Sequence, residues 1–178
     1  METVADLEQH ARFTALAETV GPPLRCYLSR RADHDQVDDV LADVFLVLWR
    51  RLGDVPGDDP LPWTYAVARG CLANARRSRQ RQLRLVERIV RVDPPAPAGD
   101  ESDHPEVLVA LAELRDLDRE IVMLWAWEGL APREIAVVTG LSANAVSIRL
   151  YKAKRRMAVL LGQDPAGAGQ EPGEGRRP

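Results

Sequence analysis

Four prolines between residues 92 and 106 limit what this chain can fold into more than any other feature. The segment VDPPAPAGDESDHPE shows no apolar periodicity. Proline cannot continue a helix, because it lacks the backbone N–H donor and clashes with the preceding turn. We therefore expect a flexible linker at residues 92–106, between a folded piece at residues 3–91 and a second one at residues 107–161. The Gly- and Pro-rich end, residues 162–178, is expected to be disordered.

Both folded pieces are expected to consist of helices. Apolar residues make up 46% of the 178 residues, which is enough for a packed core. Aromatic residues make up only 5%, alternating β-branched runs are missing, and Ala, Leu, Arg and Glu dominate. This composition favours helices over strands. The sequence thus predicts an all-α protein, with two small helical domains joined by the Pro-rich linker.

Several classes of protein are disfavoured. Cys26 and Cys71 lie far apart and outside any CxxC pattern, so two ordinary thiols in a reducing compartment are favoured over a disulfide. Three scattered histidines, with no Ser–His–Asp or P-loop signature, argue against a metal site, a cofactor or an enzyme. No apolar run approaches the ~20 residues of a membrane span, and the N-terminus lacks the features of a secretory signal. A cytoplasmic location is expected.

The charges of the chain are strongly segregated. The net charge of −3 alone argues weakly against a nucleic-acid partner. However, residues 33–59 carry eight Asp and two Arg, and residues 69–91 carry eight Arg and one Glu. Residues 92–120 carry nine acids and two Arg, and residues 144–156 carry five cations and no acid. Such blocks create local fields that the overall charge hides, so both basic blocks are candidates for nucleic-acid contact.

One helix in the first piece has an especially clear pattern. Its expected buried stripe has i, i+3, i+4, i+7 spacing and consists of Val37, Val40, Leu41, Val44, Phe45, Leu48 and Leu52. Asp33 or Asp35 is a candidate N-cap, and Gly53 can end the helix. A second face is both acidic and apolar, and consists of Asp39, Ala42, Asp43, Leu46 and Trp49. It either packs against neighbouring helices or docks another protein, and the spacing alone does not distinguish these two roles.

The next helix is expected to begin near Pro62, which the first turn tolerates, and it changes from aromatic to basic along its length. Trp63 and Tyr65 lie near its start. The arginines that follow are Arg76, Arg77, Arg79, Arg81, Arg84, Arg88 and Arg91. Arginine forks suit phosphates, and aromatic rings suit unstacked bases. Because only Glu87 opposes these cations, nucleic-acid contact is favoured over a solvated basic face.

The second piece is expected to contain four helices. The first, at residues 107–115, places on one face Leu108, Leu111 and Leu114. Asp116 is the expected cap of the second helix, whose shared face consists of Leu117, Ile121, Leu124 and Trp125. Pro132 suits the first position of the third helix. Gly140 suits the tight turn after it, and Ser142 suits the N-cap of the fourth helix.

The third and fourth helices with their short turn form a helix-turn-helix, which places its second helix in the major groove of DNA. Val146 and Leu150 are expected to point inward. The outward residues near the start of the fourth helix, where base edges would be read, are Ala143, Asn144, Ser147 and Arg149. The cations that follow suit phosphates and are Lys152, Lys154, Arg155 and Arg156. Glycine, cap and cations together favour DNA binding over a purely structural helical hairpin.

Three segments in order resemble the conserved parts of the bacterial extracytoplasmic-function (ECF, group IV) sigma factors of RNA polymerase. They are DQVDDVLADVFLVLWRRL, PWTYAVARGCLANARR and LAELRDLDREIVMLWAWEGLAPREIAVVTGLSANAVSIRLYKAKRRM. The resemblance covers nearly everything from about residue 10 to about residue 160, and the ordered combination is far more specific than any single motif. It implies a region 2-like domain at residues 3–91 and a region 4-like helix-turn-helix domain at residues 107–161.

The resemblance also implies partners and site residues. The docking face of Asp39, Ala42, Asp43, Leu46 and Trp49 would bind the clamp helices of the largest subunit of core RNA polymerase. The first domain would melt the −10 element through Trp63, Tyr65, Arg69, Asn74, Arg76, Arg77, Arg79 and Arg81. The second domain would sit on the flap of the second-largest subunit and read the −35 element through Arg133, Ser142, Ala143, Asn144, Ser147, Arg149, Lys152, Lys154 and Arg155. An anti-sigma protein is a further partner common in the family.

The chain departs from the family pattern at three places. Ala42 stands where the family usually has Gln, which affects docking on the polymerase. Gly70 stands where the family usually has Asn, near the melted strand, although Asn74 is close by. Residues 145–148 read AVSI where the family usually has Thr-Val-Lys-Ser, so a threonine contact to phosphate, at Ala145, and one cation are missing.

Three functions are compatible with these patterns. A sigma factor brings core polymerase to particular promoters and aids melting, without being an enzyme. A stand-alone helix-turn-helix transcriptional regulator would dimerise and bind a near-palindromic site without polymerase. An adaptor or antagonist would use the docking face without productive DNA binding.

Overall fold

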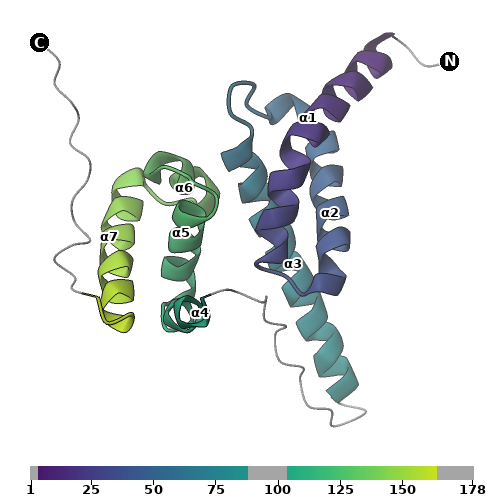
Figure 1. Ribbon diagram of the computed structural model, residues 1–178. Coiled ribbons are helices and arrows are strands. Elements are labelled where there is room, and N and C mark those ends of the chain that lie inside the picture. Colours follow the sequence, from purple (N-terminus) through teal and green to yellow (C-terminus); the bar gives the residue numbers. More distant parts are fainter. Residues whose placement is uncertain (1–3, 88–103, 164–178) are drawn as a thin grey trace, which may run out of the picture. The chain divides into compact units, whose positions relative to one another are not determined.

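The computed structural model describes residues 4–87 and 104–163 (Figure 1). Within these ranges the chain forms seven α-helices, two short 3₁₀ turns and no strand, which confirms the predicted all-α class. The chain divides into two compact units, Met1–Asp100 and Glu101–Pro178. Each unit has a core of its own.

Two expected segments fall largely outside the described residues. These are the linker at residues 92–106 and the tail at residues 162–178. At the end of the expected linker, Pro105 is already the first residue of a helix. In the two described ranges, no helix is long and apolar enough to cross a membrane.

The first unit packs three long helices together (Figure 1). They are α1 (Val4–Ser29), α2 (Val37–Arg50) and α3 (Leu61–Glu87), with the 3₁₀ turns η1 (His34–Gln36) and η2 (Leu52–Asp54) between them. Helix α2 contacts both α1 and α3, and α1 contacts α3. The most deeply buried side chains include Val20, Leu24, Tyr27, Leu28, Val44, Leu48 and Ala68. The apolar stripes of the three helices therefore enclose one core.

Helix α2 has the predicted stripe, but its ends differ from the prediction. The residues of the stripe are buried, apart from the half-buried Phe45. Asp33 makes no side-chain cap, because its carboxylate forms an ion pair with Arg79 of α3 instead. Asp35 lies inside η1, and Gly53 lies inside η2, after α2 has already ended. Tertiary contacts, rather than local capping, therefore fix the start of α2.

The second unit consists of four shorter helices, α4 (Pro105–Ala112), α5 (Asp116–Ala126), α6 (Pro132–Thr139) and α7 (Ala143–Leu160) (Figure 1). Helix α7 contacts the other three. The fully buried side chains at the centre are Ile121, Leu124, Ile135 and Val146. The predicted inward direction of α7 is confirmed, because Val146 and Leu150 are both buried.

Three details of the second unit correct the prediction. Helix α4 begins at Pro105 rather than at residue 107, and Leu108 lies at its exposed side. Trp125 is 41% exposed in the last turn of α5, although it lies one turn after the fully buried Ile121. Asp116 is the first residue of α5 rather than its cap. At this position its negative charge still interacts favourably with the positive end of the helix dipole.

One guanidinium group closes the corner between α4 and α5. Arg119 donates hydrogen bonds to the backbone carbonyls of Leu111, Ala112 and Leu114, at 2.8, 2.9 and 3.0 Å. These carbonyls lie at and just after the C-terminal end of α4, where a helix leaves its last carbonyls without i+4 partners. The Leu111 carbonyl also accepts a hydrogen bond from the backbone N–H of Leu114 at 3.1 Å. The planar fork of an arginine matches such a cluster of acceptors, whereas a lysine would supply one point charge.

The turn between α6 and α7 follows the predicted chemistry. Gly140 ends α6 with a φ of +74°, a left-handed conformation that glycine adopts without steric cost. The Ser142 hydroxyl accepts a hydrogen bond from the backbone N–H of Ala145 at 3.2 Å. Pro132 occupies the first turn of α6, and the Glu134 carboxylate accepts from the backbone N–H of Ala131 at 2.7 Å. Local sequence therefore determines this helix-turn-helix.

Both cysteines are free thiols in very different surroundings. Cys26 is exposed, whereas Cys71 is buried. Burial raises the pKa of the Cys71 thiol, and the nearby Asp43 carboxylate raises this pKa further. At pH 8, iodoacetamide is expected to alkylate Cys26 at least about tenfold faster than Cys71, because Cys71 is buried and its raised pKa lowers its own thiolate fraction. Mass spectrometry of timed samples measures both rates, and equal rates in the folded protein would contradict the buried position of Cys71.

Candidate functional site

Four of the five residues expected on the docking face of α2 lie exposed on one side of this helix. Asp39, Ala42 and Asp43 are exposed, and Leu46 is 53% exposed. Their spacing of three and four residues places them side by side along the helix surface. We call these four residues the α2 face. It combines two carboxylates with an exposed leucine, a pairing that suits a protein partner with cations around an apolar contact.

Trp49, the fifth expected residue, packs inside the first unit. Its ring lies 4.8 Å from the ring of His10 and 5.2 Å from the ring of Phe13, both in α1. The side chain is half-buried by this contact. Trp49 therefore joins α1 to α2, and we leave it out of the α2 face.

Two arginines of α3 bind the connection between α1 and α2. Arg76 donates to the backbone carbonyl of Arg31 at 2.6 Å, and Arg79 forms an ion pair with Asp33. The two side chains of the Arg79–Asp33 pair are 37% and 38% exposed, so solvent only partly screens them. These arginines fix α3 against the rest of the unit, a role that the sequence pattern did not indicate.

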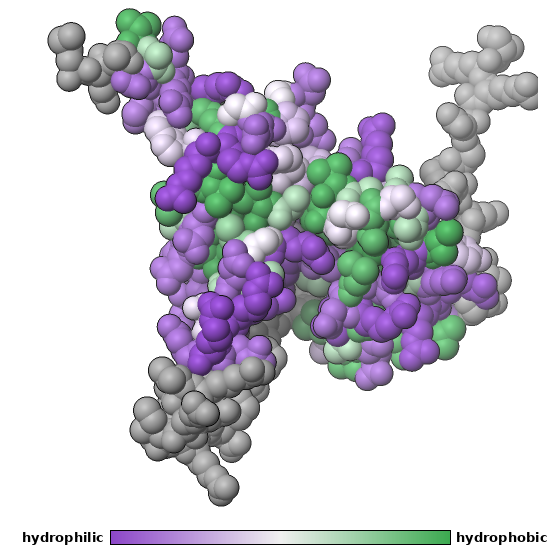
Figure 2. Space-filling model, turned by 180° about the vertical axis from the view of Figure 1, so that it is seen from behind, coloured by the Kyte–Doolittle hydropathy of each residue, from purple (hydrophilic) through white to green (hydrophobic). Residues whose placement is uncertain are grey.

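Three further arginines of α3 face solvent. Arg69, Arg77 and Arg81 are exposed, and so is Asn74. The side-chain oxygen of Asn74 accepts a hydrogen bond from Arg77 at 2.5 Å. Figure 2 shows hydrophilic surface over the C-terminal half of α3. This part of α3 is suited to phosphates.

The two aromatic residues at the start of α3 differ in accessibility. Trp63 is half-buried, and the guanidinium of Arg51 lies 5.1 Å from the centre of its ring. Tyr65 is only 3% exposed, and its ring packs 5.0 Å from that of Tyr27. The prediction that Tyr65 contacts bases is wrong for this conformation, because neither ring face is open. Its position lies on the inward stripe of α3, which also buries Ala68 and Leu72.

Arg149 of α7 is turned toward α5 rather than outward. One of its terminal nitrogens lies 2.8 Å from the carboxylate of Asp118, a residue that is only 8% exposed. The same carboxylate accepts from Arg115 at 2.9 and 3.0 Å. A buried carboxylate requires such partners, so the Arg149 side chain is held against α5, with 36% of it exposed. The contact of Arg149 with base edges stays a prediction, and it would have to compete with this ion pair.

Most other residues expected at the −35 element lie in the open. The exposed residues are Arg133, Ser142, Ala143, Asn144, Ser147, Lys152 and Arg155. Lys154 is half-buried instead, with its ammonium group 4.3 Å from the centre of the Trp125 ring. The helix thus presents an amide, hydroxyls and cations on the side away from its core.

The sequence pattern missed two exposed residues on the outer side of α7. Ile148 is 48% exposed and Tyr151 is 53% exposed. Their spacing was a signal that could have found them, because Ile148 lies four residues and Tyr151 seven residues after Asn144. An apolar and an aromatic side chain therefore share this surface with the expected polar contacts.

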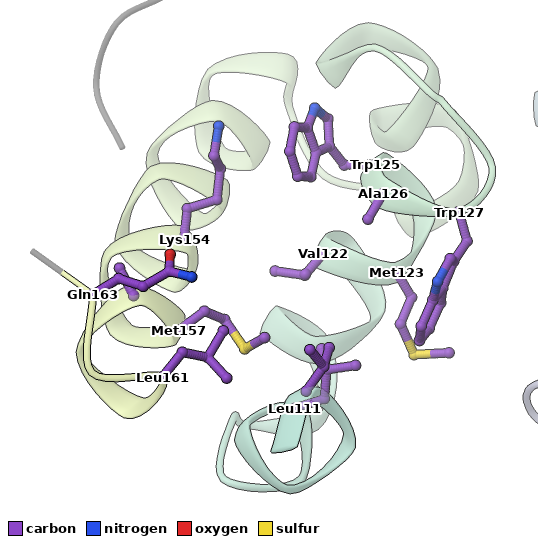
Figure 3. Close-up of a pocket in the computed structure, with 12 residues that line it drawn as sticks. Leu111, Val122, Met123, Trp125, Ala126, Trp127, Lys154, Met157, Leu161 and Gln163 are labelled. Carbon is purple, nitrogen blue, oxygen red and sulfur yellow. The ribbon is translucent and has the colours of Figure 1, made fainter. Parts of the chain in front are cut away.

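The second unit also contains an apolar pocket of about 280 Å³ between α4, α5 and α7. Figure 3 shows how side chains of three helices border it. Leu111 comes from α4, Trp125 from α5, and Met157 from the C-terminal half of α7. Lys154, above Trp125, lies at the same pocket. Helix α7 therefore contributes both to the exposed outer surface described above and to the lining of this pocket.

Similarity to known proteins identifies the family of this chain. The family model described as Sigma-70, region 4 matches residues 104–157, which include α4 to α6 and most of α7. The RNA polymerase sigma factor NccH of Alcaligenes xylosoxydans xylosoxydans is 30% identical over 135 residues, which cover 70% of this chain and 73% of NccH. The sigma factor CnrH of Cupriavidus metallidurans is 30% identical over 143 residues, 72% and 74% of the two chains.

This chain belongs to the ECF sigma factors. It is a transcription initiation factor of RNA polymerase, as the resemblance of its three segments implied. The comparisons give no support to the alternative of a stand-alone regulator.

Solved structures confirm the fold of this sigma factor. The sigma factor RpoE of Bartonella quintana, in complex with the anti-sigma factor NepR, has a TM-score of 0.67 at 22% identity. That match covers 85% of this chain and 98% of RpoE. The structure of CnrH in complex with the cytosolic domain of CnrY has a TM-score of 0.57 at 26% identity, and the match covers 84% and 87% of the two chains.

Proposed function

We propose that the first unit of this sigma factor docks on the clamp helices of the largest polymerase subunit through the α2 face, and contacts the −10 element through α3. The supporting observation is the contrast between two exposed surfaces of one unit. Asp39 and Asp43 offer carboxylates beside the exposed Leu46, whereas Arg69 and Arg81 offer open cations. A protein surface with cations complements the first, and a polyanion complements the second.

The second unit reads the −35 element with α7 in the major groove in this proposal. Support comes from Asn144, Lys152 and Arg155, which are exposed on α7, and from the fixed turn that precedes them. The amide suits base edges and the cations suit phosphates. The apolar pocket between α4, α5 and α7 is the surface that we assign to the flap of the second-largest subunit, because its lining is apolar and largely separate from the DNA contacts.

An anti-sigma protein is a further partner in this proposal. The support is that RpoE and CnrH, which share this fold, were each solved with a protein bound: an anti-sigma factor and the cytosolic domain of CnrY, respectively.

Run-off transcription with purified core polymerase and genomic DNA fragments tests the proposed function. We expect defined start sites that appear only when the full chain is added. DNA that is retarded without polymerase, and is unaffected by core polymerase, would favour a stand-alone regulator. Binding to core polymerase without transcripts would favour an adaptor or antagonist.

A further inference from the structure

The outer side of α7 is apolar at its centre. Ile148 and Tyr151 are 48% and 53% exposed, although they lie in a helix rich in cations. They are three residues apart and thus adjacent on the helix surface, on the side opposite to the buried Val146 and Leu150. Exposed apolar side chains of this size have no role in the core of the unit.

Polar groups suited to DNA flank this apolar pair on the same side. Asn144 lies one turn before Ile148, and Arg155 lies one turn after Tyr151, with its guanidinium 5.8 Å from the centre of the Tyr151 ring. Spacings of four, three and four residues keep all four side chains on one surface. A partner that meets the amide and the guanidinium therefore also meets the apolar pair.

Two polar candidates for base reading are already engaged within the unit. The Ser147 hydroxyl donates to the backbone carbonyl of Ala143 at 3.0 Å. The Arg149 guanidinium binds Asp118 at 2.8 Å, so a bidentate contact from Arg149 to guanine would first have to break a half-buried ion pair. Ile148 and Tyr151 are thus the exposed side chains at the centre of the outer side of α7.

The major groove displays one apolar group at base-pair level, the C5-methyl group of thymine. We propose that Ile148, with Tyr151 beside it, sets the sequence preference of this sigma factor upstream, by contacting the methyl groups of one or two adjacent thymines. This inference rests on the proposed function, because it requires the N-terminal half of α7 in the major groove. A protein contact is the competing explanation for the exposed pair.

The test uses holoenzyme assembled from the full chain and core polymerase. Promoter fragments with a randomised upstream element are selected by binding, and each enriched thymine is then replaced by deoxyuridine, which lacks only the C5-methyl group. We expect the wild-type holoenzyme to lose about threefold to tenfold in affinity at one or two positions. The Ile148→Ser holoenzyme should bind thymine and deoxyuridine fragments equally.

Val159→Ser is the matched control. Val159 is 63% exposed on the same side of α7, about 16 Å further along the axis, so its variant should keep the full preference for thymine. An Ile148→Ser holoenzyme that still discriminates thymine from deoxyuridine would overturn the proposal, and so would reduced affinity of this variant for core polymerase. Selected promoters that are indifferent to the methyl group would overturn this inference alone. Absence of any sequence-selective binding by wild-type holoenzyme would overturn the proposed function as well.

Discussion

Changing Asp39 and Asp43 together to arginine is expected to weaken binding to core RNA polymerase by about 10- to 100-fold, or about 1.4–2.8 kcal/mol. Each substitution places a cation where the proposed partner surface is cationic, and like charges at an interface repel strongly. Both carboxylates are exposed, so the free energy of unfolding should fall by less than about 1 kcal/mol. Part of that cost comes from the loss of the Asp39 carboxylate in the first turn of α2, because a negative charge there interacts favourably with the helix dipole.

Titration of labelled core polymerase with each variant measures this effect. Asp58→Arg with Asp59→Arg is the matched control, because both residues are exposed before α3 and the net charge changes equally. The control pair should bind core polymerase like the wild type, apart from a small effect that added salt removes. Unchanged affinity of the Asp39/Asp43 variant would remove the α2 face from the proposed interface.

Arg149→Ala is expected to destabilise the second unit by about 1–3 kcal/mol, because it removes a hydrogen-bonded partner from a buried carboxylate. Asp118 would then be left with Arg115, whose side chain is 84% exposed. Hydrogen exchange of the α5 and α7 amides measures the loss for this unit separately from the first. Asp118→Ala combined with Arg149→Ala should be less destabilising than the sum of the two single changes.

Arg133→Ala provides the comparison for this cycle. Arg133 is also 84% exposed, and it lies 3.8 Å from the carboxylate of Glu134, an arrangement that contributes little at a surface. Its exchange rates should match the wild type. If Arg149→Ala left exchange unchanged and impaired binding only to certain promoters, Arg149 would read bases after all.

Much of the fold could be predicted because spacing along one helix identifies its inward stripe. The stripe of α2, the glycine between α6 and α7, and the Ser142 cap all depend on residues close in sequence. Helix α1 offered no such signal. It contains Pro22 and Pro23 in its interior, and prolines ordinarily end or bend a helix. Helix α1 contacts α2 and α3, and burial of neighbours such as Leu24 and Tyr27 offsets the cost of these prolines.

The site was less predictable because long-range pairs determine which charged side chains stay free. Arg79 and Asp33 are 46 residues apart, and Arg149 and Asp118 are 31 residues apart. From composition and spacing alone, all of these charged groups are predicted to be available to bind a partner. In the folded protein some of them form ion pairs with each other instead. For the same reason the sequence predicts contact with the −10 element for Tyr65 as well as Trp63, although Tyr65 lies in the core.

The double use of α7 has a thermodynamic consequence. Its 18 residues form one uninterrupted helix, about 27 Å long, with proposed DNA contacts at one end and Met157 of the apolar pocket near the other. If a ligand of the pocket prefers one orientation of α7, it changes the affinity of this helix for DNA. DNA must then change the affinity of the pocket for that ligand by the same factor. Binding of promoter DNA and binding at the pocket would then each depend on the other through α7.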